Sequence, residues 1–504
     1  MLKRTTHLLV ALLAATCLAT SALAQTLIIA QGTDAVTLDP HDVTDSPTAT
    51  IASHMFETLF DYTPEGEIVP HLAHDYEFSS DGLVLTLHIR DDVTFHDGTP
   101  LTAEVVKGSL DRFLDPANAF TFRFLLDRVE EVVVTGEHTV ELHLSTQFAP
   151  LLAHLTHNTV SVVLPSNVAD LETNPIGTGP FSFASRDVGT SIDLERYDGY
   201  WGEQPGVSGV RFLSVPENTT RMALVESGEA HVAVRVPPQD IARLDATPGI
   251  TVENVSSLRT IFIYLNVEVE PLNNPLVRQA LNYAVNNDDI AEFVVGGAVR
   301  PSDAPIAPGI FGYTPLGGYD YDPERARELL AEAGYPDGFS TTFYSPTGRY
   351  LQDIQIAEAI QPMLAEVGIN ATIETLEWAA FLELTSLPVE ETVVPMALMG
   401  WGTVTGDADY GLFALFHTSE HVPDGSNRAF YSNSMVDALL DEARTNTDPT
   451  VREQIYTDAM NLIWTDAPWL FLHSETQLVA VRDGVNGVVI HPTERVLALT
   501  ASLD

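Results

Sequence analysis

The alternation of apolar and polar residues predicts strands in the first half of the chain. Residues 26–31 (TLIIAQ) form an apolar run typical of a buried strand. Residues 81–90 (DGLVLTLHIR) follow an Asp-Gly turn and alternate apolar with polar positions, as in a half-buried strand. Residues 130–144 predict two more strands around a turn at 135–138, and residues 102–113 predict a helix. We therefore expect a first half rich in sheet.

Helical spacing of apolar residues dominates the second half. The clearest helix spans residues 323–333 (PERARELLAEA), which begin with a proline and end before Gly334. Other predicted elements are helices at 274–284, 352–367, 435–446 and 450–465 and a strand at 370–374. Because helices alternate with strands, the pattern indicates α/β lobes.

The first 24 residues have the features of a secretory signal peptide. Lys3 and Arg4 precede an apolar stretch at 8–18, and small residues at 22–24 (ALA) predict cleavage before Gln25. The stretch is too short for a membrane-spanning helix, which needs roughly 20 apolar residues. We therefore expect an exported, periplasmic protein.

Cys17 is the only cysteine of the chain and lies inside this segment. Residues 15–17 (ATC) resemble a lipoprotein cleavage box, and in this alternative the mature protein would carry a lipid on Cys17. In the favoured interpretation the mature chain starts at Gln25 and has no cysteine. Disulfides, thiolate nucleophiles and cysteine-based metal sites are then excluded.

Length and charge narrow the class of protein further. The roughly 480 residues after the signal peptide are too many for one core, so two or more lobes are expected. Asp and Glu number 70 against 24 Lys and Arg, a formal net charge of −46. A field of this sign repels nucleic acid and anionic membranes. It suits a protein kept soluble in salty surroundings, and an acidic surface that recruits a cationic ligand is the alternative.

Seven segments, in order along the chain, carry a family resemblance. They are 38–40 (LDP), 56–106, 177–183 (GTGPFSF), 196–212 (RYDGYWGEQPGVSGVRF), 265–290, 321–339 and 400–410 (GWGTVTGDADY). Together they resemble the peptide-type solute-binding proteins of ABC importers (family 5, cluster C), whose members bind di- and oligopeptides, glutathione or nickel chelates. Residues 406–409 (GDAD), 431–449 and 463–470 are most similar to the glutathione-binding receptors, and parts are shared with dipeptide-binding ones.

The resemblance implies an α/β, bilobal periplasmic-binding-protein fold of type II with an extra subdomain in the first lobe. Lobe I would comprise residues 25–260 and 478–504, with the subdomain near 56–165, and lobe II would comprise residues 265–477. Two strands, near 258–266 and 474–480, would join the lobes as a hinge that closes around the ligand.

The implied function is capture and delivery. A monomeric receptor would bind a short peptide, such as glutathione or a di- or oligopeptide, between the lobes and pass it to the permease subunits of an ABC importer. Separate ATPase subunits would supply the energy, and no cofactor or metal is expected. Receptors of the same fold for a nickel chelate, an opine or a sugar are the alternative.

The loop at 401–409 holds the first candidates for ligand contact. In peptide-binding relatives an acidic residue of this loop pairs with the ligand's ammonium group, and this chain has Val404 where the dipeptide-binding pattern has an aspartate. Asp407 or Asp409 could substitute through a charge-assisted hydrogen bond. The alternative is that these two residues cap the following helix. The residues expected in the cleft wall are Trp401, Thr403 and Thr405.

Two arginines are candidates for the ligand carboxylate. Arg259 lies at the implied hinge of a chain with few cations, so it could hold a carboxylate bidentately. An interlobe salt bridge is the alternative role. Arg349 lies near the position where relatives use an arginine for the ligand carboxylate. Asp45, with Asp42 and Thr44, follows the first strand and is expected at the cleft mouth, or as a loop cap.

A secreted metal-dependent hydrolase is the distant alternative. The HxxH spacings at 71–74 and 154–157 lack the glutamate of HExxH, and no GxSxG elbow is present. The GTG at 177–179 matches neither a dinucleotide-binding motif nor a P-loop. We therefore predict a binding protein and not an enzyme. A nickel-chelate receptor would need Arg259 and His417 to face each other in the cleft.

Overall fold

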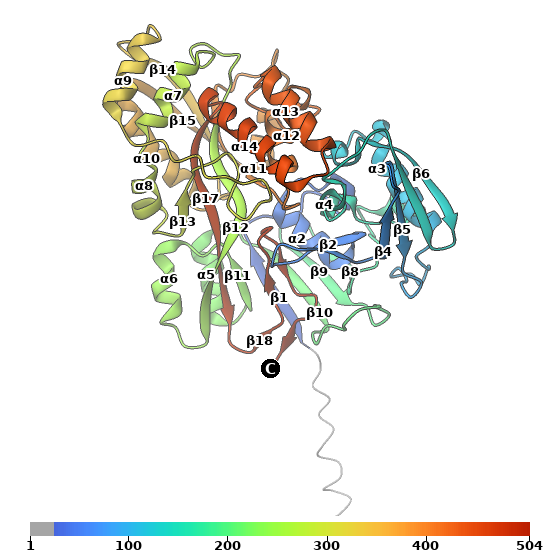
Figure 1. Cartoon of the computed structure of the whole chain (residues 1–504). Helices are drawn as coiled ribbons and strands as arrows, with labels where there is room; N and C mark the ends of the chain where they lie inside the picture. Colours follow the sequence, from blue (N-terminus) through green and yellow to red (C-terminus); the bar gives the residue numbers. More distant parts are fainter. Residues whose placement is uncertain (1–24) are drawn as a thin grey trace, which may run out of the picture.

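The computed structural model describes residues 25–504, so the predicted signal peptide and Cys17 lie outside the described residues. Within residues 25–504, no helix has the length and apolar character needed to cross a membrane. Figure 1 shows two halves, one above the other, with two long strands running between them.

An eleven-stranded sheet extends through both halves. Ten strands follow the order β15-β14-β16-β12-β17-β11-β1-β10-β9-β8, and β13 pairs with β17. Their bounds are β1 Thr26–Gln31, β8 Phe181–Asp187, β9 Ser191–Arg196, β10 Gly209–Ser214, β11 Val232–Val234, β12 Ile250–Leu265, β13 Val299–Pro301, β14 Phe339–Pro346, β15 Ile369–Leu376, β16 Met396–Gly402 and β17 Trp469–Arg482. The predicted strand at 26–31 is confirmed, and β15 confirms the one at 370–374.

The long strands β12 and β17 join the two halves (Figure 1). They pair antiparallel from Ile250 to Tyr264, with a register shift between Ser256 and Thr260. This irregularity lies where the sheet passes from β11 and β1 to β16 and β14. The predicted pair of crossing strands is confirmed. We call the half with β1 and β8–β11 lobe I and the half with β14–β16 lobe II, and the residue boundaries given above stay a prediction.

Lobe II carries most of the helices, and polar caps mark their first residues. Their bounds are α7 Pro275–Ala284, α8 Asn287–Asp289, a π-helical turn Ile290–Val294, α9 Pro323–Glu332, α10 Asp353–Glu366, α11 Trp378–Thr385, α12 Ala408–Phe416, a short 3₁₀ turn Thr418–Glu420, α13 Ser434–Thr445 and α14 Pro449–Asp466. Asp322 accepts a hydrogen bond from the Arg325 amide at the start of α9. Asp448 accepts hydrogen bonds from the amides of Thr450 and Val451 at the start of α14. The five predicted helices of this region are confirmed to within two residues at each end.

Lobe I holds a separate four-stranded sheet in the order β4-β5-β7-β6, beside a small β2–β3 pair. Its remaining elements are α2 Ser46–Met55, α3 Ala103–Leu114, α4 Leu151–His154, α5 Asn218–Ser227, α6 Pro238–Asp245, β2 Phe60–Tyr62, β3 Ile68–Pro70, β4 Ala73–Phe78, β5 Val84–Ile89, β6 Val129–Gly136, β7 Thr139–Leu144, 3₁₀ turns at 40–42, 116–118, 123–126, 158–160 and 165–170, and β18–β21 in the tail (485–486, 489–490, 496–497 and 502–503). The strands and helix predicted at 81–90, 130–144 and 102–113 are confirmed.

Two glycines bring the 177–179 segment against α2. A Cβ on Gly177 would lie 1.9 Å from the Met55 carbonyl oxygen, and one on Gly179 would lie 2.6 Å from the His54 carbonyl oxygen. Only glycine permits this close approach of two backbones. The GTG segment therefore has a packing role: it fixes the end of α2, whose other end faces the cavity described next.

Candidate ligand-binding site

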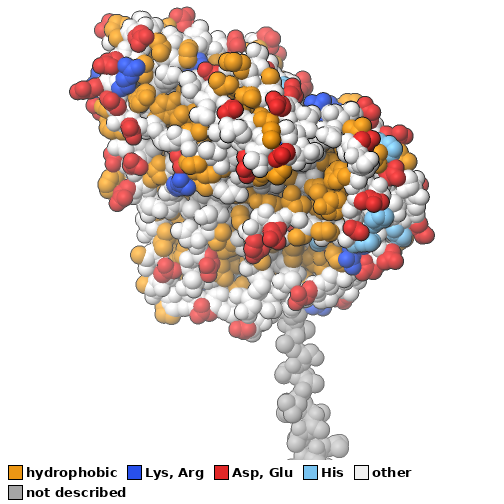
Figure 2. All heavy atoms as spheres, viewed as in Figure 1, with side chains coloured by type: hydrophobic (Ala, Val, Ile, Leu, Met, Phe, Trp, Pro, Cys, Tyr) orange, Lys and Arg blue, Asp and Glu red, His pale blue; other side chains and the backbone are white. Residues whose placement is uncertain are grey.

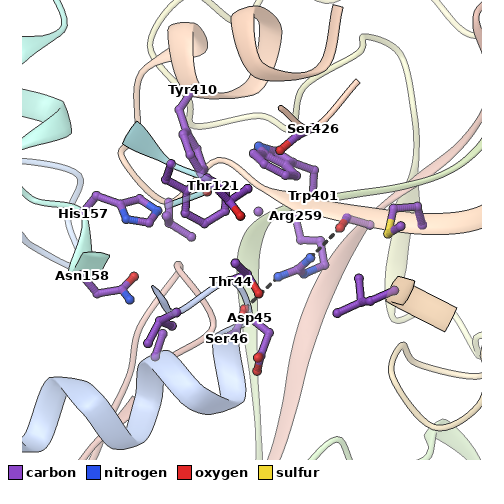
Figure 3. Close-up of a pocket in the computed structure, with 18 of the residues that line it drawn as sticks. Thr44, Asp45, Ser46, Thr121, His157, Asn158, Arg259, Trp401, Tyr410 and Ser426 are labelled. Carbon is purple, nitrogen blue, oxygen red and sulfur yellow. Dashed lines mark hydrogen bonds between the residues drawn. The ribbon is translucent and has the colours of Figure 1, made fainter. Parts of the chain in front are cut away.

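A cavity of about 260 Å³ lies between the lobes. Lobe I contributes residues 43–46 at the start of α2, residues 156–158 and residues 493 and 495 of the C-terminal tail. Lobe II contributes segments around residues 349–350, 378–386, 399–404 and 423–428. Figure 3 shows this arrangement, with Thr44, Asp45 and Ser46 at the start of the helix and Trp401 and Tyr410 across the cavity.

The first turn of α2 presents polar groups to the cavity. Asp45 is the N-cap, and its carboxylate accepts hydrogen bonds from the amide and the hydroxyl of Thr48 at 3.0 and 2.9 Å. Ser46 follows, and its hydroxyl accepts a hydrogen bond from Arg259 at 2.8 Å. Asp45 thus lies at the cavity as expected and also has the capping role given as its alternative. Asp42, by contrast, lies in the preceding 3₁₀ turn.

Arg259 lines the cavity with its charge already neutralised. Its Nε donates to Glu494 at 2.6 Å, and its Nη1 donates to the carbonyl oxygen of Gly400 at 2.9 Å. Burial opposes the charge, but Glu494 raises the pKa of Arg259 above its usual value. This geometry is the salt bridge that the sequence left as the alternative for Arg259.

Two buried carboxylates lie beside Arg259: Glu475 on the crossing strand β17 and Glu494 in the C-terminal tail. Glu475 on β17 lies 3.8 Å from the Arg259 Nε, and its other oxygen accepts a hydrogen bond from the Leu351 amide of lobe II. Burial and the neighbouring Glu494 raise the pKa of Glu475 to about 7. Proton binding at Glu475 therefore alters the charge of the hinge directly beneath the cavity.

Arg349 forms no ion pair within residues 25–504, although Glu494 acts on its charge from a longer distance. The side chain is 2% exposed, and within residues 25–504 neither its Nε nor its Nη1 has a hydrogen-bond partner. The guanidinium lies over the rings of Tyr350 and Trp378, at 4.8 and 5.0 Å from their centroids. Burial and the nearby Arg259 lower the pKa of Arg349 to about 10, so the group is still cationic at neutral pH.

Loop geometry holds Arg349 in place. The residue follows β14, and its amide and that of Tyr350 both donate to the Asp353 carboxylate, at 2.8 and 3.2 Å. Asp353 is the first residue of α10, so the helix start anchors the loop. An unpaired guanidinium on an anchored loop inside a cavity is suited to bind an oxyanion of a ligand.

An aromatic group closes the other end of the cavity. Tyr410 lies 5.0 Å from Trp401, 4.9 Å from His157 and 5.7 Å from Phe122, measured between ring centroids. Burial, together with His154 and Arg495, lowers the pKa of His157 to about 3, so this imidazole is neutral. The indole Nε1 of Trp401 is buried with no hydrogen-bond partner in the described part of the chain. This wall can cover the apolar part of a solute and donate one hydrogen bond to it.

The structure directs the other candidates of the 401–409 loop away from the cavity. The Thr403 amide donates to the Leu258 carbonyl oxygen, and the Thr405 hydroxyl accepts from the Asp407 amide at 3.3 Å. Asp407 caps α12, and both of its carboxylate oxygens lie 2.9 Å from Arg452. The residues Thr403, Thr405, Asp407 and Asp409 are not among those that line the cavity.

Asp409 belongs to a second contact between the lobes, which we call the interlobe cluster: Asp127, His154, Asp409 and Arg444. Asp409 lies 3.2 Å from His154 and 3.4 Å from Arg444, and all three side chains are fully buried. Arg444 also donates to both oxygens of Asp127, at 2.9 and 3.0 Å. Burial opposes ionisation, yet Arg444 and His154 hold the pKa of Asp409 below its usual value. The cluster therefore brings charges of opposite sign together across the lobe interface.

The histidine pairs noted in the sequence lie in different places. His71 contacts Glu57 at 3.0 Å, and His154 belongs to the interlobe cluster. His417 stacks on Phe413 at 4.4 Å and is not a cavity residue, so it does not face Arg259 there. No group of three His, Cys, Asp or Glu side chains in residues 25–504 is arranged to hold a metal ion.

Sequence reasoning missed several cavity residues. Arg428 and Arg495 line the cavity from the loop before α13 and from the C-terminal tail, and the aromatic wall includes Phe122, His157 and Tyr410. The scarcity of cations, which drew attention to Arg259, applies equally to Arg428 and Arg495. That signal could have found them.

The chain matches one family of known proteins over most of its length. Residues 67–421 match the bacterial extracellular solute-binding proteins, family 5, middle. The glutathione-binding protein GsiB of Pectobacterium atrosepticum is 33% identical over 475 residues, which cover 93% of this chain and 92% of that protein.

Two solved structures have the same fold. DppA from Helicobacter pylori, an ABC transporter-associated periplasmic binding protein in complex with peptide STSA, superposes with a TM-score of 0.88 at 29% identity, covering 95% of this chain and 98% of that chain. AgaA from A. tumefacien R10, in complex with agropinic acid, superposes with a TM-score of 0.86 at 27% identity, covering 95% and 99%. The predicted bilobal periplasmic-binding-protein fold is confirmed.

Proposed function

The chain belongs to the bacterial extracellular solute-binding proteins of family 5, and we propose that it captures a short peptide, with glutathione as the first candidate, for an ABC importer. The peptide would lie in the cavity between the lobes and leave chemically unchanged. The partner would be the permease of the importer, which a monomeric receptor would reach in the periplasm after export by the predicted signal peptide.

The unpaired guanidinium of Arg349 carries this proposal. A buried charge without a counter-ion costs several kcal/mol, and a folded protein tolerates that cost where a ligand supplies the partner. Every peptide has a terminal carboxylate that can bind such a group bidentately. The relatives support the same class, because GsiB is named as glutathione-binding and DppA holds a peptide.

Asp45 is the acidic group available for the ammonium end of a peptide. The other acids proposed for this role, Asp407 and Asp409, are engaged by Arg452 and Arg444. Asp45 lines the cavity, and its two carboxylate oxygens accept hydrogen bonds from Thr48 at the start of α2. The cavity thus offers an arginine for one end of a peptide, an aspartate for the other and an aromatic wall between them.

A receptor for an opine-like carboxylate is the second candidate. It is favoured by the similarity to AgaA, which holds agropinic acid. Such a solute would use the same arginine. A nickel chelate has less support, because His417 lies against Phe413 instead of in the cavity.

A thermal-shift panel tests the proposal. Residues 25–504 would be heated with glutathione, mixed di- and tripeptides, nickel–histidine and sugars. A ligand at 100 times its Kd should stabilise the protein by about 2.7 kcal/mol. Arg349→Gln should abolish the shift, whereas Arg327→Gln, at an exposed pair with Glu366, should keep it. Stabilisation by sugars or nickel–histidine but by no peptide would contradict the proposal.

A further inference from the structure

The charges around the cavity have the opposite sign to those of the rest of the molecule. Four of its lining residues are arginines, and Asp45 is the one carboxylate among the lining residues that the structure describes. The whole chain has 70 Asp and Glu against 24 Lys and Arg. Because arginines are scarce in this chain, the presence of four around one cavity indicates that they serve to bind a ligand.

Three of the four arginines lack a carboxylate partner within residues 25–504. Arg259 pairs with Glu494, and Arg349 has the unpartnered guanidinium nitrogens described above. Arg428 donates to the Ser386 hydroxyl at 3.1 Å and the Ser426 carbonyl oxygen at 3.4 Å, and its Nε is buried without a partner.

Arg495 completes the set from the other lobe. It donates to the hydroxyls of Thr493 and Ser53, at 2.9 and 3.2 Å, and Asp61 acts on it without forming an ion pair. Burial lowers the pKa of Arg495 and also that of Arg428. Both pKa values fall because the surroundings do not compensate the charge.

The hinge charges compensate these arginines only in part. Glu494 acts on Arg259, Arg235 and Arg349, and Glu475 acts on Arg259 and Arg235. Among the lining residues within 25–504, Arg349, Arg428 and Arg495 form no ion pair, and Asp45 is the one carboxylate. The uncompensated charge is positive, and a solute must supply more than one negative charge to neutralise it.

We propose that the solute carries at least two carboxylates, bound by Arg349 and Arg428 of lobe II at one side and by Arg495 of lobe I at the other. This inference rests on the proposed receptor function and specifies its ligand class. A solute with anionic groups at both ends would connect cations of the two lobes, so that binding favours the closed arrangement. Glutathione, with two carboxylates and one ammonium, fits this class, and peptides with one carboxylate do not.

Calorimetric titration with matched probes tests the inference. The probes are glutathione, its glycine monoethyl ester, trialanine, glutarate and citrate, at one ionic strength. Each lost carboxylate should weaken binding about tenfold or more, the effect of one charge-assisted hydrogen bond. Glutathione should therefore bind at least about tenfold more tightly than the ester and trialanine.

Substitutions assign the carboxylates to individual arginines. Arg428→Gln and Arg495→Gln should each weaken glutathione binding about tenfold, and one of them should leave the affinity for the ester unchanged. The exposed Arg325, paired with Glu328, provides the control substitution Arg325→Gln. Both cavity variants should unfold at or above the parent temperature, because neither arginine has an ion pair to lose.

The outcomes separate this inference from the function on which it rests. Equal affinity for glutathione, the ester and trialanine would overturn the inference and keep the peptide receptor. Binding of citrate or glutarate without any peptide, sensitive to Arg428→Gln or Arg495→Gln, would keep the inference and overturn the peptide assignment. Failure of every probe would overturn both.

Discussion

Buried arginines at the interface between the lobes have two kinds of surroundings in the described part of the chain, one with acidic partners and one without. In the interlobe cluster, Arg444 has Asp409 and Asp127 as partners, one from each lobe. In the cavity, Arg349 has none within residues 25–504. The cluster joins the lobes with charges that the protein itself supplies, whereas in the proposed function the solute would supply the partner of Arg349. The proposal therefore assigns stability and binding to different arginines at one interface.

Replacing each of these two arginines by methionine should give the largest difference in stability. Arg444→Met leaves Asp409 buried without its arginine and with only His154 of the interlobe cluster beside it, so the free energy of unfolding should fall by about 3–5 kcal/mol. Arg349→Met removes an unpaired charge, so the unliganded protein should keep its stability or gain some. Urea unfolding followed by circular dichroism, without ligand, measures both.

The double variant Asp409→Asn/Arg444→Met separates loss of charge balance from loss of packing, since Arg444 also lies over the ring of Phe413. It should recover part of the stability lost in Arg444→Met. Equal destabilisation by Arg444→Met and Arg349→Met would contradict the distinction between the two regions.

The hinge lies beside the cavity, and its charge should depend on pH. Glu475 has a pKa of about 7 in the folded protein, against 4.5 for an unperturbed glutamate. The folded state therefore binds the proton more tightly, and this contribution to stability is full below pH 4.5 and lost as the pH rises through 7. Glu475→Gln imitates the protonated form and should remove this dependence.

Unfolding at pH values from 4.5 to 8 measures the effect. Relative to the parent, Glu475→Gln should gain about 1–3 kcal/mol across this range. Glu358→Gln, on the exposed side of α10, serves as the control and should show no such gain. A constant difference between Glu475→Gln and the parent would mean that Glu475 is ionised in the folded protein throughout the range.

The smallest effect is expected at Asp45, which caps α2 and which the proposal pairs with the ammonium group of the ligand. Asp45→Asn keeps a good N-cap for α2 and should change stability by less than about 0.5 kcal/mol, whereas Asp45→Ala should cost about 1 kcal/mol. Both should weaken binding of glutathione about tenfold by removing the charge opposite its ammonium group.

N-acetylated glutathione, which has no ammonium group, provides the control ligand for Asp45. Its affinity, measured by calorimetry, should be the same for the parent and Asp45→Asn. A loss of affinity for this acetylated ligand as well would show that Asp45 acts through the position of α2 instead.

Much of the fold could be predicted from local sequence. Pro323 and Gly334 bracket α9, and the Asp-Gly turn at 81–82 precedes β5, because caps and turns depend on neighbouring residues. The long extent of β12 could not be predicted in this way. Its outer part has an irregular burial pattern and is defined by pairing with β17, more than 200 residues away in sequence.

The site was less predictable, because the ion-pair partners of its residues come from distant parts of the chain. Asp407 and Asp409 stand in a loop that the family resemblance links to ligand binding, yet each meets an arginine from α13 or α14. Nothing within the loop indicates these partners. Arg349 and Arg444 are both buried, and whether an acid lies within ion-pair distance of each is a property of three-dimensional packing.

The acidic exterior has a consequence for the speed of capture. Figure 2 shows Asp and Glu side chains spread over the visible face, with few Lys and Arg among them. An anionic solute approaching from a distance meets repulsion from a net charge of −46, and attraction from the cavity arginines acts only nearby. Dissolved salt shortens the range of that repulsion to about 8 Å at physiological ionic strength. The association rate constant should therefore rise with added salt, opposite to the trend for oppositely charged partners, and capture would be fastest in brine.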